Sequence, residues 1–124
     1  MVRVAVEPEC WRRESLVEAV ELGGGEVTSP NVAEALVWAE PARADLLPPM
    51  LDDNPNIDWV QLPYAGIEPF LQMLRSRPNL TWTCGKGVYA SPVAEHALAM
   101  ALAGLRGLTS YAQVGSWSEP QGRN

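Results

Sequence analysis

Short apolar runs alternate with helix-patterned segments along almost the whole chain, and this alternation most constrains the fold. The runs are rich in β-branched and aromatic residues, and Pro or Gly follows each closely, which is typical of short buried strands. We expect strands over residues 2–6, 26–28, 35–39, 58–62 and 80–84. Because parallel neighbours must be joined by crossovers, helices between consecutive strands predict an α/β fold with a parallel sheet.

Helical periodicity fills the segments between these strands. The expected helices cover residues 11–22, 43–51, 68–75 and 91–106. In the first helix, apolar residues share one face, while Arg12 and Arg13 belong to the opposite, charged face. The fold class we expect is a three-layer flavodoxin-like α/β sandwich with a parallel five-stranded sheet, followed by a long C-terminal linker helix.

Length and composition limit the classes of function. A chain of 124 residues is the size of one domain, and an apolar fraction of 47% can form a core without disulfides or metal. A net charge of −6 repels phosphate backbones, so no nucleic-acid partner is expected. No apolar run reaches the length of a membrane span, and the start reads as a strand rather than a signal peptide. We therefore expect no membrane partner and a cytoplasmic protein.

The single His and the two Cys residues show no catalytic or metal-binding pattern. Cys10 and Cys84 lie far apart without ligand spacing, so we expect reduced thiols and no metal site. Cys84 has no His/Asp pair beside it and is interpreted as a small hydrophobic residue of the interior. His96 lies in an Ala-rich helix without a nearby nucleophile, which argues against catalysis.

The five tryptophans fall into two groups. Trp11, Trp38, Trp59 and Trp82 lie in or beside predicted elements, so we expect them to pack in the core or between layers. Trp117 lies in a polar tail, where an exposed indole indicates docking against another surface.

Ligands of open parallel sheets bind beyond the carboxyl ends of the strands. The candidate segments are therefore residues 7–9, 40–41, 63–66 and 85–87. Residues 62–68 are the most informative, because small residues let backbone N–H groups approach a ligand and a helix start follows at once. Such a cradle suits a carboxylate. The same residues also fit an ordinary strand-to-helix turn that needs Gly, so both interpretations remain open.

Two stretches carry a resemblance to a known family. Residues 64–68 read YAGIE after a strand, and residues 88–99 read VYASPVAEHALA. Both are similar to segments of the D-isomer-specific 2-hydroxyacid dehydrogenases, and the resemblance is specific mainly over residues 57–117. It implies a substrate-binding domain over residues 1–90. It also implies an interdomain helix and tail over residues 91–124, leading to a cofactor-binding domain that this chain lacks.

The resemblance implies roles for individual residues near the fourth strand. The substrate-binding segment consists of Tyr64, Ala65, Gly66 and Ile67. The backbone amides of Ala65 and Gly66 would hold the substrate carboxylate, and Tyr64, larger than the family's common Ser, would line the pocket near the substrate's C3 group.

The same resemblance implies a cofactor contact on the long helix. Val93 and Ala94 would face the nicotinamide, while NAD or NADP would be bound mainly by the absent domain. No catalytic residue is expected in this chain, since the family's acid/base His, its carboxylate partner and its Arg belong to the second domain.

The function implied is the substrate-binding portion of an NAD(P)-dependent oxidoreductase that interconverts a D-2-hydroxy acid and a 2-keto acid. The parent enzyme would be a homodimer, and the 124 residues alone are expected to be inactive.

Two other classes of function stay open. A receiver-like or flavin-binding module is partly fitted by Glu7, Glu9 and Lys86, although no Asp follows the third strand and residues 8–11 do not suit a phosphate. A non-catalytic module could instead dimerise through the apolar face of the helix over residues 91–106.

Overall fold

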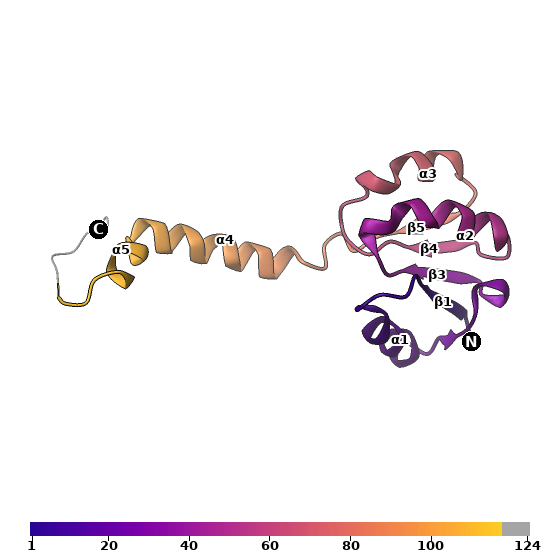
Figure 1. Ribbon diagram of the computed structural model, residues 1–124, viewed down its shortest axis with the longest axis horizontal. Helices are drawn as coiled ribbons and strands as arrows, with labels where there is room; N and C mark the ends of the chain where they lie inside the picture. The colour runs from indigo at the N-terminus through magenta and orange to yellow at the C-terminus, as the bar shows by residue number, and fades with distance from the viewer. Residues whose placement is uncertain (118–124) are drawn as a thin grey trace. The chain divides into compact units, whose positions relative to one another are not determined.

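The computed structural model describes residues 1–117 and contains a five-stranded, all-parallel sheet (Figure 1). The strands are β1 (Arg3–Glu7), β2 (Glu26–Val27), β3 (Ala35–Trp38), β4 (Trp59–Gln61) and β5 (Thr81–Thr83). Their order in the sheet is β2-β1-β3-β4-β5. The predicted flavodoxin-like α/β sandwich is confirmed, since each parallel pair is joined by a crossover that carries helical turns.

The helices follow the predicted segments closely. They are α1 (Arg13–Leu22), α2 (Leu47–Asp53), α3 (Leu71–Ser76), α4 (Ala90–Leu105) and α5 (Leu108–Ala112). Short 3-10 turns, η1 (Pro30–Val32), η2 (Pro41–Leu46) and η3 (Glu68–Phe70), lie in the crossovers. The predicted C-terminal helix is α4. The sequence did not predict α5, which begins after Gly107, where a φ of 63° ends the preceding helix.

One face of the sheet packs against α2 and α3 to form the main core. Side chains alternate along a strand, so Leu36 and Trp38 of β3 point to this face and are fully buried. The other core residues are Ala5, Ala33, Leu47, Leu51, Ile57, Val60, Leu62, Phe70 and Met73. Burial of these side chains is what holds three- and four-residue strands together, because strands this short have few ladder hydrogen bonds.

The opposite face of the sheet is covered less completely. Helix α1 packs on β1 and β2 and contains no fully buried residue. Trp59 of β4 points to this face, where α1 does not reach, and is 40% exposed. Trp11 is 84% exposed, because α1 begins only at Arg13 and the indole belongs to the preceding turn. The prediction that all four early tryptophans are packed was therefore wrong for Trp11 and only partly right for Trp59.

The chain divides into two compact units, Met1–Lys86 and the part that begins at Gly87, and each is described here by itself. Gly87 has a φ of 90°, a conformation that L side chains rarely adopt, so glycine is required at this junction. In the second unit α4 contacts α5. No helix among residues 1–117 combines the length and apolar character that crossing a membrane requires.

The core predicts a contrast between two leucine substitutions. Leu36→Ala should lower the free energy of unfolding by about 2–5 kcal/mol, because it leaves a cavity between the sheet and α2. Leu22→Ala, at a side chain that is 82% exposed, should change it by less than about 0.5 kcal/mol. Urea denaturation followed by far-UV circular dichroism measures both, and equal losses would show that the assigned core is wrong.

Candidate functional site

The loop after β4 lies at the carboxyl edge of the sheet and is open to solvent. Tyr64 is 41% exposed, and Ala65 and Gly66 are exposed as well. Within residues 1–117, no hydrogen bond occupies the backbone N–H of Ala65 or of Gly66. Two neighbouring amide donors are thus free to bind an acceptor from outside, as an anion cradle requires.

The ends of this loop are fixed, although its amides are free. The Tyr64 carbonyl accepts a hydrogen bond from the Gly85 N–H at 3.1 Å, which ties the loop to the segment after β5. Ile67 is half-buried and packs against the core, and its carbonyl accepts the Phe70 N–H at 2.9 Å. Ile67 therefore anchors the loop, whereas Tyr64, Ala65 and Gly66 are exposed to solvent.

A carboxylate already lies beside the loop. A Cβ added to Gly66 would come within 2.9 Å of a Glu68 carboxylate oxygen, so the Glu68 side chain folds back over this glycine. The predicted helix start is the 3-10 turn η3, and α3 has only six residues. So short a helix adds little dipole, so α3 itself would contribute little to the attraction of an anion.

Arg12 is the residue of this edge that the sequence analysis missed. Its guanidinium carbon lies 4.8 Å from the centroid of the Tyr64 ring, a cation–π contact. Its Nη1 donates to the Ala39 carbonyl at 3.2 Å. The side chain thus crosses from the loop after β1 to the segments after β3 and β4. The prediction that Arg12 lies on the solvent face of the helix was wrong, because Arg12 is the N-cap of α1 and its side chain reaches the loops after β3 and β4.

Arg13, its neighbour, is engaged within the protein. Its Nε donates to the Val6 carbonyl at 2.9 Å, and its Nη1 lies 3.2 Å from a Glu9 carboxylate oxygen. Glu7 ends β1 nearby. Burial raises the pKa of the Glu7 carboxyl, the positive charge of Arg13 opposes this rise, and Glu9 adds to it.

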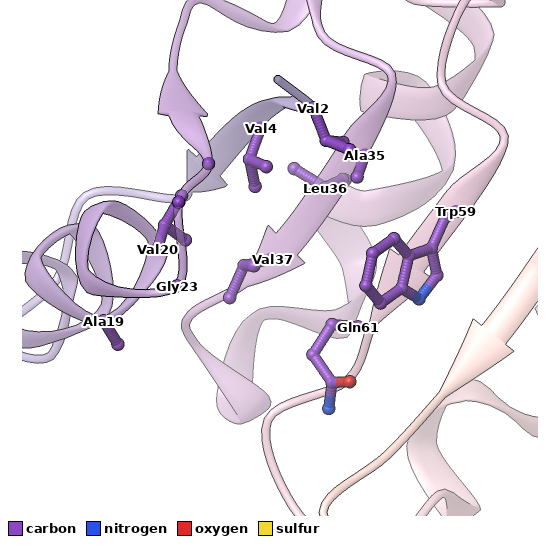
Figure 2. Close-up of a pocket in the computed structure, with 12 residues that line it drawn as sticks. Val2, Val4, Ala19, Val20, Gly23, Ala35, Leu36, Val37, Trp59 and Gln61 are labelled. Atoms are coloured by element: carbon purple, nitrogen blue, oxygen red, sulfur yellow. The ribbon is translucent and has the colours of Figure 1, made fainter.

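An apolar hollow lies elsewhere, between α1 and the incompletely covered face of the sheet (Figure 2). It has a volume of about 310 Å³, and Val20, Val37 and Trp59 are among its lining residues. The Trp59 Nε1 donates to the Thr83 hydroxyl at 2.7 Å, so the polar atom of this indole is already satisfied. The hollow offers no titratable group and therefore little chemistry.

The other residues considered in the sequence analysis lie in the second unit or pack against the core. Val93, 62% exposed, and Ala94 lie on α4, in the unit that begins at Gly87. His96 is also exposed on α4, and Cys84 is half-buried against the core. Among residues 1–117, no group of three or more His, Cys, Asp or Glu side chains is placed to hold a metal ion.

Comparison of the chain with protein-family models, with curated proteins and with solved structures finds no match.

The raised pKa of Glu7 predicts a pH-dependent difference between wild type and Glu7→Gln. The contribution of Glu7 to stability should fall as pH rises from about 4.5 to its folded-state pKa, because the folded protein holds this proton more tightly than the unfolded chain. Glu7→Gln lacks this titration, so its stability relative to wild type should rise over the same window and then stay constant. Urea denaturation at a series of pH values measures the difference, and a decrease with pH would contradict the assignment.

Proposed function

We propose that residues 1–86 are the acid-binding portion of an NAD(P)-dependent D-2-hydroxyacid dehydrogenase. The observation that carries this proposal is the exposed loop after β4, in which Ala65 and Gly66 present two unoccupied backbone N–H groups. A carboxylate is the small ligand that such a pair of donors fits best, and the carboxyl edge of a parallel sheet is the usual place for it. The YAGIE motif is similar to that family's, and this similarity suggests a 2-hydroxy or 2-keto acid as the ligand.

The task of this portion is to bind and orient, not to react. The loop amides would hold the C1 carboxylate of a 2-keto or 2-hydroxy acid, and Tyr64 would limit the size of the group at C3. NAD or NADP, when bound, would accept or donate the hydride. Val93 and Ala94 are small, apolar and exposed, as a contact with a nicotinamide requires. A protonating residue would come from outside this chain.

Carboxylate binding predicts a local change in the amide NMR spectrum. Titration of the 124-residue chain with pyruvate should shift the ¹H–¹⁵N resonances of Ala65 and Gly66 before any others. The Ala42 amide is an internal control, because it follows β3 in a comparable turn but already donates to the Glu40 carboxylate at 3.1 Å. Absent shifts at Ala65 and Gly66, or equal shifts at Ala42, would count against the proposal.

The Glu68 carboxylate beside Gly66 predicts that removing its charge improves binding. Glu68→Gln should lower the Kd for pyruvate by about two- to fivefold, because a like charge next to the cradle repels the incoming acid. Glu18→Gln is the matched control, since it makes the same change in net charge at an exposed position of α1. Isothermal titration calorimetry measures both, and equal effects would mean that only net charge matters.

A further inference from the structure

We propose that Arg12 is the charged anion-recognising residue of this site and binds the same carboxylate as the loop amides of Ala65 and Gly66. The inference rests on the proposed function for the class of ligand. It adds a side chain that the resemblance did not imply, and it assigns Tyr64 a second task, to position the guanidinium.

Topology places Arg12 where ligands of such sheets bind. In the order β2-β1-β3-β4-β5, the chain leaves β1 toward β2 and later returns on the other side to form β3. In folds with this strand order, ligands bind at the switch point, between the loops after β1 and β3. Arg12 comes from the first of these loops and donates to the Ala39 carbonyl in the second. It therefore places a positive charge between these two loops.

The contacts of Arg12 leave most of its donors available. A guanidinium carries five N–H groups in one plane, and among residues 1–117 only Nη1 is engaged, by Ala39. The guanidinium carbon lies over the Tyr64 ring, and the other N–H groups make no hydrogen bond within the described residues. A guanidinium held by these two contacts loses little side-chain entropy when a carboxylate binds to it in a bidentate manner.

The local charge balance calls for such a residue. Acidic side chains end or follow several strands at this edge, namely Glu7, Glu9, Glu40 and Glu68. Arg13 is already paired with Glu9, whereas Arg12 makes no ion pair with any carboxylate of the described chain. Neutral amides alone would have to attract an anion against these charges, and Arg12 offsets them.

The role of Arg12 also explains the aromatic residue at position 64. Tyr64 directly precedes the two free amides, so a guanidinium that stacks on its ring is held beside the cradle. A phenyl ring would serve equally well for this purpose, whereas an aliphatic side chain would not.

The test is a set of Kd values for pyruvate, measured by isothermal titration calorimetry on the 124-residue chain. Arg12→Gln should raise Kd about tenfold. Arg12→Lys should have a Kd between those of wild type and Arg12→Gln, because an ammonium keeps the positive charge but not the paired N–H donors of a guanidinium. Tyr64→Leu, which removes the ring, should lose several-fold in affinity, and Tyr64→Phe, which keeps it, should lose less. Arg43→Gln, which removes an exposed charge paired with Asp45, is the control and should change Kd less than about twofold.

Neutral pyruvamide separates charge recognition from a structural role, because its binding should not depend on Arg12. If Arg12→Gln and Arg12→Lys bind pyruvate as wild type does, while the amides of Ala65 and Gly66 still shift in the NMR titration, the inference about Arg12 is overturned and the proposed function stands. If Arg12→Gln weakens the binding of pyruvate and the binding of pyruvamide equally, Arg12 only supports the loop and the inference is again overturned. If the wild-type chain binds no pyruvate, both proposals fail.

Discussion

The sheet depends on one constraint: five very short strands must run in the same direction and share one buried face. Strands of two to five residues make few hydrogen bonds with each other, so the packing of Leu36, Trp38, Val60 and Leu62 against α2 and α3 has to hold them. A parallel arrangement also collects all the strand ends at one edge. The loops after β1, β3 and β4 therefore meet there, whatever their own sequences are.

Most of the framework could be predicted from the sequence, because hydrophobic periodicity and Pro/Gly punctuation determine where strands and helices lie. All five strands and four of the five helices fall within predicted segments or within a few residues of them. The loop over residues 63–66 could be found as well, since a small-residue turn after a buried strand has a recognisable pattern.

The contacts within the site could not be predicted in the same way. Arg12 belongs by periodicity to the charged face of a helix, and periodicity does not show that its side chain, at the N-cap of α1, reaches Ala39 and Tyr64. Trp59 was expected to be packed but is 40% exposed. The sequence does not show which parts of a sheet face the helices will cover. The signal that would have drawn attention to Arg12 is its place just before the first helix, after the strand beside which the sheet order reverses.

The hydrogen bond between the Tyr64 carbonyl and the Gly85 N–H has a mechanical consequence. Gly85 lies two residues before Gly87, whose positive φ marks the start of the second unit. The first unit is therefore held by main-chain atoms up to Gly85, and a change of backbone conformation at Gly87 would begin beyond this hydrogen bond. Side-chain substitutions in the loop would leave this tie in place, because both of its partners are backbone atoms.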